Sequence, residues 1–480
     1  MVLSVVSEIY PLIKTGGLGD VTGAIPLALS EHGVQFVTLV PGYPAVMAQL
    51  SDAHPVISID DLFGGPARVL SGRAANHDLL VIDAPHLFDR DGNPYIDADG
   101  FDWPDNALRF GALGWIASRI ALGDIGDVRP DIVQCHDWQA GLTLAYLAYD
   151  GRPRPATIMT IHNLAYQGLF PADLLDALRL PPAAMQIDGI EYYGKIGFLK
   201  AGLQFADRIT TVSATYAAEM QTPANGFGLD GLLRARSDII TGIVNGIDIA
   251  VWNPLRDTRI PSRFGRSTLA KRSGNKVHLQ QHLGLDVEPS RLLFGVVSRL
   301  AWQKGLDLLA DAVPALLATG AQLAVLGAGD LELEHRFEAL AAAHPGRIGC
   351  RIGYNEDMAH LIQAGADSLL VPSRFEPCGL TQLCALRYGA IPVVAKVGGL
   401  ADTIHDPEEP GSNPDTATGL HFSPVTHDAL EGALLRIHEL WSHKKEWQRL
   451  QRNGMLTDVS WKESAVLYAR LYTDLAGKKA

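Results

Sequence analysis

The first residues with the types and spacing for chemistry form a glycine-rich segment with a lysine at its start. Lys14-Thr15-Gly16-Gly17-Leu18-Gly19-Asp20 follows an apolar run at 2–6 and leads into a helical pattern that begins at Val21. Glycines at a strand-to-helix turn allow backbone N–H groups to approach an anion, and the helix N-terminus adds a partial positive charge. The segment is a candidate phosphate site, although a tight turn without a ligand would use the same glycines. No Gly-Lys-Ser/Thr sequence ends it, which disfavours ATPase chemistry.

A pair of cationic residues follows an apolar run in the second half of the chain. The segment Ser298-Arg299-Leu300-Ala301-Trp302-Gln303-Lys304-Gly305 comes directly after the run at 292–298. Two cations can stabilise a leaving diphosphate without a metal, because negative charge develops on that group in the transition state. Solvated surface charges are the alternative. The position at the end of a predicted strand favours a diphosphate site for Arg299 and Lys304.

A third candidate loop combines an acid with backbone donors. Glu376-Pro377-Cys378-Gly379-Leu380-Thr381 follows the apolar run at 367–371 and precedes a helical pattern. The backbone after Cys378 can offer N–H groups to a phosphate, and Glu376 can accept hydrogen bonds from sugar hydroxyls. A favourable charge in the first turn of a helix would also explain the glutamate. The glycine turn at 396–400 is weaker evidence by itself.

Polar clusters also end two predicted strands of the first half. These are Cys135-His136-Asp137-Trp138 and Ile161-His162-Asn163. One histidine at such a place is more often structural, but two clusters at neighbouring strand ends favour a functional site. Hydrolase and zinc motifs are missing from the sequence. The aromatic loop at 92–106 suits sugar binding, and its composition is equally common in surface loops.

The elements that must position these residues alternate between short apolar runs and helical patterns. Such alternation predicts doubly wound α/β sheets with parallel strands. The pattern restarts after residue 245, so we predict two Rossmann-like domains, 1–244 and 245–455, and a C-terminal helix within 456–480 that packs on the first. Ligands of such sheets bind at the carboxyl ends of the strands, so we expect the site in a deep cleft between facing domains. The strand-like runs lie at 2–6, 36–40, 79–83, 131–135, 157–161 and 208–212, then at 292–298, 322–326, 348–352, 367–371 and 391–395.

Composition narrows the classes of partner. The 480 residues are 47% hydrophobic and 19% charged, which is typical of a folded globular protein, and the formal net charge is −13. This charge disfavours nucleic acid and anionic membrane surfaces as partners. Four scattered cysteines without metal-ligand spacing favour a reducing cytoplasm. We expect no transmembrane span and no signal peptide, and the sequence does not predict an oligomeric state.

Taken in order, these segments resemble the bacterial glycogen synthases and plant starch synthases, which are family 5 glycosyltransferases with the GT-B fold. The resemblance spans nearly the whole chain. Its departures are Gly19, where the family more often has alanine, the altered loop at 223–228, and Cys384, where many related transferases have a second glutamate. The matching segments are Ser7-Glu8, Pro11, 14–18, 136–138, 160–168, 198–200, 211–213, 245–248, 252–254, 298–300, 303–305, 376–382 and 398–400.

The resemblance implies a retaining transferase that moves glucose from ADP-glucose to the nonreducing end of an α-1,4-glucan such as glycogen, with no metal or other cofactor. It also implies roles for residues of this sequence. The donor would be held by Lys14, Gly16, Gly17 and Asp20, and its diphosphate would be bound by Arg299 and Lys304. Glu376 would bind the donor glucose, and Tyr354 would pack near the adenine. Sugar and phosphate would both be contacted by Cys378, Gly379, Leu380 and Thr381. Asp137, His162 and Asn245 would line the catalytic centre together with Lys14, Arg299, Lys304 and Glu376, and Tyr95 would lie on the acceptor side.

Three alternatives stay open at the level of sequence. A transferase that uses UDP-glucose to make another glucoside has the same physical requirements, and only the resemblance favours adenine. A non-catalytic glycan-binding protein of this fold would be expected to lose the cationic pair or the Glu376 loop, and both are present. A phosphorylase shares the architecture but depends on pyridoxal phosphate, for which the sequence gives no indication.

Overall fold

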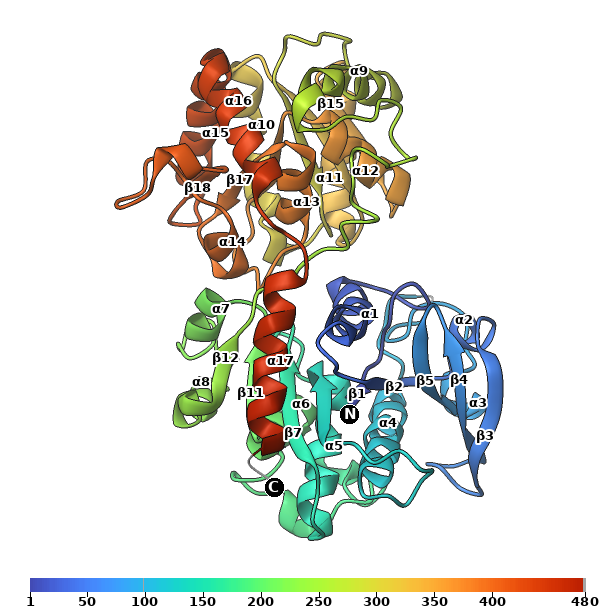
Figure 1. Ribbon diagram of the computed structural model, residues 1–480. Coiled ribbons are helices and arrows are strands. Elements are labelled where there is room, and N and C mark those ends of the chain that lie inside the picture. The colour runs from blue at the N-terminus through green and yellow to red at the C-terminus, as the bar shows by residue number, and fades with distance from the viewer. Residues whose placement is uncertain (98, 478–480) are drawn as a thin grey trace. The chain divides into compact units, whose positions relative to one another are not determined.

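The computed structural model describes residues 1–97 and 99–477, and Figure 1 shows its helices and strands. The chain forms two compact units. The first consists of Met1–Asn245 together with the chain from Trp461 onward, and the second is Gly246–Ser460. The boundary after Asn245 therefore lies one residue beyond the predicted end of the first domain, and the boundary after Ser460 lies five residues beyond the predicted end of the second domain.

The first unit is built on a nine-stranded sheet with the order β12-β11-β7-β6-β1-β2-β5-β4-β3. The strands from β12 to β5 are parallel, and β4 and β3 complete the sheet as an antiparallel hairpin. All six predicted strands are present. The bounds are β1 Val2–Val5, β2 Phe36–Pro41, β3 Ser51–Ile59, β4 Ala67–Ala74, β5 His77–Asp83, β6 Ile132–His136, β7 Ala156–Ile161, β11 Arg208–Thr211 and β12 Ile240–Gly242, with a separate small sheet of β8 Leu169–Pro171, β10 Lys195–Gly197 and β9 Glu191–Tyr192.

The hairpin of β3 and β4 was not among the predicted strands. In β3 the first five side chains are exposed, and the strand contains Asp52, His54 and Pro55, so it lacks an apolar run. In β4 buried and exposed side chains nearly alternate, with Val69 inside and Arg68 and Arg73 outside. That period of two is the ordinary signal of a half-buried strand.

Helices pack on this sheet through apolar faces. The Val21, Ile25 and Leu29 stripe of α1 is buried, and it shares a core with Tyr468 and Tyr472 of α17. The Tyr472 hydroxyl donates to Gln134 Oε1 of β6 at 2.5 Å, so the C-terminal helix is tied to the sheet as well as packed on α1. The helices are α1 Gly17–Ser30, α2 Pro44–Met47, α3 Pro85–Phe88, α4 Asn106–Ala121, α5 Asp137–Asp150, α6 Phe198–Phe205, α7 Ala214–Glu219, α8 Asp230–Ala235 and α17 Lys462–Gly477.

The second unit has a six-stranded sheet in which every pairing is parallel, with the order β15-β14-β13-β16-β17-β18. Five of its strands were predicted, whereas the three-residue edge strand β18 was not. Parallel strands buried on both faces explain the continuous apolar runs of this half. The elements are β13 Leu293–Val297, β14 Gln322–Gly327, β15 Ile348–Ile352, β16 Ser368–Val371, β17 Ile391–Ala395 and β18 Leu420–Phe422, and α9 Arg272–His282, α10 Leu306–Ala318, α11 Leu331–Ala343, α12 Glu356–Gly365, α13 Thr381–Tyr388, α14 Gly398–Thr403, α15 His427–Ser442 and α16 Lys444–Leu456.

No helix within residues 1–97 and 99–477 combines the length and the apolar character needed to cross a bilayer.

Candidate active site

The parallel strands of the first unit bring several predicted site residues to one edge of the sheet. Lys14 follows β1, Asp137 follows β6, His162 follows β7, and Asn245 follows β12. The strands β12, β11, β7, β6 and β1 are adjacent in this order and run parallel, so their carboxyl ends form one continuous edge of the sheet. This is where ligands of open α/β sheets bind.

Asp137 is the most perturbed acid at this edge. It starts α5 with a φ of +53°, which is a left-handed conformation that costs a non-glycine residue energy. Its Oδ1 accepts hydrogen bonds from the backbone N–H groups of His162 at 2.7 Å and Asn163 at 3.4 Å. Burial nevertheless raises the pKa of Asp137 to about 7. A strained, buried carboxyl that titrates near neutrality is a feature of functional sites.

Two histidine rings lie beside this acid. His136 Nδ1 and His162 Nε2 are 2.9 Å apart, and the rings stack with centroids 5.2 Å apart. A hydrogen bond between two ring nitrogens requires one N–H group and one lone pair. Burial lowers the pKa of His162 to about 3 and that of His136 well below its ordinary value. The pair is therefore neutral at physiological pH and can act as a dipole but not as a cation.

Glu8 connects the glycine turn to the aromatic loop, and the sequence did not assign it a role. Its buried carboxylate accepts hydrogen bonds from the Thr15 backbone at 2.5 Å, from the Thr15 hydroxyl at 2.7 Å and from the Tyr95 hydroxyl at 2.5 Å. The Tyr95 hydroxyl also lies 2.7 Å from Ser7 Oγ. In this structure the Tyr95 hydroxyl is thus occupied by the protein itself. A carboxylate directly after a buried strand was the available signal for Glu8.

The glycine turn has the form expected of an anion site. Gly16 is the residue before α1 and makes no side-chain cap, and α1 starts at Gly17. Lys14 lies near this helix N-terminus, where its Nζ forms an ion pair with Asp20 at 2.8 Å. The two predicted donor-binding side chains are therefore in contact with each other.

Asn245 stands where the first unit ends. Its side chain is buried, and its Oδ1 has no hydrogen-bond partner among the described residues. A buried amide oxygen without a donor is costly, which makes this atom a candidate to accept a hydrogen bond from a ligand.

In the second unit an ion pair joins two of the predicted donor-binding residues. Lys304 Nζ lies 2.8 and 2.6 Å from the two carboxylate oxygens of Glu376. Ser373 Oγ donates to the same carboxylate at 2.7 Å. The two side chains are only 19% and 8% exposed. The residue after Lys304 must be glycine for the chain to pass this close to Pro372. The φ of Gly305 is +65°, and an added Cβ would lie 1.9 Å from the Pro372 carbonyl oxygen.

The loop after Glu376 forms a compact cradle before α13. Gly379 has a φ of +72°, and Gln382 Nε2 donates to the carbonyl oxygens of Cys378 and Gly379 at 2.9 and 2.8 Å. Thr381 Oγ1 contacts the Val297 carbonyl of β13 at 3.4 Å. The loop therefore lies beside the carboxyl end of β13, where Arg299 follows with an exposed side chain.

Tyr354 follows β15, at the opposite end of the sheet from β18. It is 76% exposed, and its hydroxyl contacts Glu356. An exposed ring of this kind offers an apolar face to a ligand. Within the described part of the chain, no group of three or more His, Cys, Asp or Glu side chains is arranged to hold a metal ion.

Comparison with known sequences identifies the family of this chain. Residues 1–235 match the profile of the starch synthase catalytic domain, and residues 283–454 match that of the group 1 glycosyl transferases. A glycogen synthase of Rhodopseudomonas palustris strain BisB18 is 60% identical over 98% of this chain and 97% of its own length. A glycogen synthase of Methylocella silvestris is 58% identical over 100% of this chain and 99% of its own length.

Solved structures that are similar to this chain are also glycosyltransferases. The catalytic domain of starch synthase IV from Arabidopsis thaliana, bound to ADP and acarbose, matches with a TM-score of 0.89 and 30% identity over 99% of each chain. Sucrose-phosphate synthase from Thermosynechococcus elongatus matches with a TM-score of 0.60 at 16% identity over 99% of each chain, and so shares the fold. The predicted GT-B class is confirmed. By its 60% identity over nearly the entire length of a relative, this chain belongs to the glycogen synthase family of glycosyltransferases.

Proposed function

We propose that the protein transfers glucose from ADP-glucose to the nonreducing end of an α-1,4-glucan, with retention of the anomeric configuration. The observation that carries the proposal is the Lys304–Glu376 pair beside the glycine-containing loop 378–381, in a chain 60% identical to a glycogen synthase. Adenine as the base is supported by the structural relative, a starch synthase bound to ADP.

The donor is bound in the following way. Arg299 and Lys304 contact the diphosphate, because their charges neutralise the group that leaves. Glu376 accepts hydrogen bonds from the glucose hydroxyls while Ser373 keeps its carboxylate oriented. The remaining donor contacts within the second unit come from the backbone and side chains of Cys378, Gly379, Leu380 and Thr381, and from Tyr354 against adenine. In the first unit Lys14, Gly16, Gly17 and Asp20 form the proposed anion-binding segment for the donor.

The reaction needs no protein nucleophile. The bond between glucose C1 and the diphosphate oxygen breaks, and the acceptor O4 bonds to C1 on the same face. The acceptor hydroxyl gives its proton to the leaving phosphate oxygen. The neutral His162 and the uncharged amide oxygen of Asn245 stabilise positive charge near the sugar ring, and Asp137 fixes the backbone of the loop that carries His162.

We further propose that the reaction is independent of metal ions and takes place in the cytoplasm. Two cations already provide charge for the leaving group, and Cys135, Cys350, Cys378 and Cys384 are all free thiols, which suits a reducing compartment. Tyr95 contributes to the acceptor side through its ring.

Incubation with labelled ADP-glucose and glycogen in the presence of EDTA tests these proposals together. We expect label in the glycogen, release of ADP and no loss of rate with the chelator. A parallel reaction with labelled UDP-glucose measures the choice of base. Faster transfer from UDP-glucose would overturn the proposed donor, and loss of transfer in EDTA that Mg²⁺ restores would overturn metal independence.

A further inference from the structure

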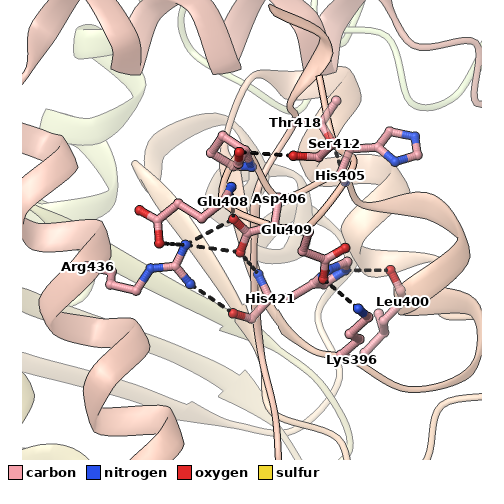
Figure 2. A network of polar contacts seen from close by, with 11 residues as sticks. Lys396, Leu400, His405, Asp406, Glu408, Glu409, Ser412, Thr418, His421 and Arg436 are labelled. Atoms are coloured by element: carbon pink, nitrogen blue, oxygen red, sulfur yellow. Dashed lines mark hydrogen bonds and ion pairs between the residues drawn. The ribbon is translucent and has the colours of Figure 1, made fainter. Parts of the chain in front are cut away.

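The second unit contains a network of charged residues in addition to the Lys304–Glu376 pair. It joins the segment 405–418 to Lys396 after β17, to His421 within β18 and to α15, and Figure 2 shows its contacts. The network borders a hollow of about 280 Å³. Its basic side chains are Lys396, His421 and Arg436, and its carboxylates are Asp406, Glu408 and Glu409.

His421 stands at the centre of the network, on the edge strand β18, and it is only 6% exposed. Its Nδ1 lies 2.7 Å from Glu409 Oε1, and its Nε2 lies 3.3 Å from the Leu400 carbonyl oxygen (Figure 2). A carboxylate oxygen and a carbonyl oxygen can only accept hydrogen bonds. Both contacts therefore form together only when both ring nitrogens carry a proton.

The surrounding charges agree with this protonation state. Glu409 also receives Lys396 Nζ at 2.9 Å, and Arg436 pairs with Asp406 at 3.0 Å and with Glu408 at 2.8 Å. With His421 protonated, three cations face three carboxylates. Although burial alone would raise the pKa of Glu409, the hydrogen bonds from Lys396 and His421 hold it below its ordinary value.

The backbone of His421 is fixed independently of its ring. Its N–H donates to Asp406 Oδ2 at 2.7 Å, and its carbonyl accepts from Arg436 Nη1 at 3.2 Å. A change at the ring is therefore transmitted to Leu400 and Glu409 rather than to the strand.

Leu400 belongs to α14, which braces the donor loop. The Gly399 N–H donates to the carbonyl oxygens of Glu376 at 3.0 Å and Pro377 at 3.1 Å. The two segments approach so closely that a Cβ on Gly399 would lie 2.2 Å from the Cys378 carbonyl oxygen. The position of α14 thus sets the position of the Glu376 backbone.

We propose that the protonated His421 is a positioning residue for the donor site, which holds α14 against the Glu376 loop and makes donor affinity depend on its charge. The inference rests on the proposed function, because that function assigns the loop to ADP-glucose. Loss of the ring proton removes one of the two contacts and frees α14 from the network. The affinity for the donor then falls as the pH rises.

The test compares wild type with two variants in steady-state kinetics across pH. In His421→Phe an aromatic ring remains but both ring nitrogens are lost, so we expect the KM for ADP-glucose to rise about tenfold at low pH and to lose its pH dependence. In Glu409→Gln the imidazolium loses its counter-charge, so the increase in KM should begin at a lower pH than in wild type. In both variants kcat should change less than KM.

Glu408→Gln is the matched control, since Glu408 lies in the same segment and pairs with Arg436 but makes no contact with the His421 ring in the described structure. Its KM profile should follow wild type. Equal profiles in all four proteins, or equal shifts in both glutamate variants, would overturn the proposal. An NMR titration of the His421 ring, assigned with the phenylalanine variant, reports its charge without any substrate. Failure of wild type to use ADP-glucose would instead refute the proposed function.

Discussion

Replacing Lys304 by methionine tests whether the ion pair with Glu376 has both a structural and a catalytic role. A fully buried pair that loses one partner costs about 3–5 kcal/mol, and an exposed pair about 0–1 kcal/mol. The two side chains are 19% and 8% exposed, and Ser373 still donates to the remaining carboxylate. We therefore expect the free energy of unfolding to fall by about 2–3 kcal/mol. The kcat should fall about 100- to 1,000-fold, the usual effect of losing one contact to developing charge.

The double variant with Glu376→Gln separates the two effects. Removing both charges leaves no uncompensated carboxylate, so most of the lost stability should return, whereas kcat should stay low. Denaturant unfolding of the full chain measures the first quantity, and transfer of labelled glucose the second. A folded Lys304→Met protein with kcat within tenfold of wild type would refute the catalytic role. A double variant as unstable as the sum of the single changes would refute the energetic coupling.

Three further predictions concern pH and backbone geometry. Burial alone would lower the pKa of His360, but its bond to Asp257 at 2.7 Å raises it overall. Its stabilising effect is therefore complete below about pH 6.5 and lost as the pH rises through the folded-state pKa, and His360→Phe should flatten this part of the stability profile measured by thermal unfolding. Burial raises the pKa of Asp137 to about 7, so ionisation of this carboxyl destabilises the fold as the pH rises from about 4 to 7. The Asp137→Asn variant should therefore be about 2–4 kcal/mol more stable than wild type at pH 8, while it transfers glucose more slowly. Equal stability of the two proteins at pH 8 would contradict this prediction. Gly305→Ala places a Cβ 1.9 Å from the Pro372 carbonyl oxygen, and calorimetry should show a loss of ADP binding that Gly320→Ala, also at a positive φ but with no atom near the added Cβ, does not show.

Most of the fold was predictable because its strands are buried on both faces. β1 and β6 consist largely of apolar residues, and such runs stand out from the helical patterns between them. The hairpin of β3 and β4 lies at the sheet edge with polar side chains exposed, so no continuous run marks it. The three-residue β18 is too short for any period to be recognised.

The candidate site was predictable where glycine or a charged residue stands in the loop between a parallel strand and the next helix. Gly16, Lys304 and Glu376 all lie in loops that follow the carboxyl ends of the parallel strands β1, β13 and β16. The sequence could not predict which of these side chains contact one another. The Lys304–Glu376 pair joins residues 72 positions apart, and the bond between Glu8 and Tyr95 joins residues 87 apart. Such contacts depend on the packing of whole loops, which local spacing does not encode.

The return of the chain to its first unit has a consequence for synthesis on the ribosome. All of Gly246–Ser460 is translated before α17 exists, so the later unit has its complete sequence first. Until α17 has been synthesised, the nascent first unit exposes the apolar surface of α1 that Tyr468 and Tyr472 later cover. A chain truncated after residue 460 would still contain every residue of the second unit, but its first unit would lack α17 and would leave the apolar face of α1 exposed.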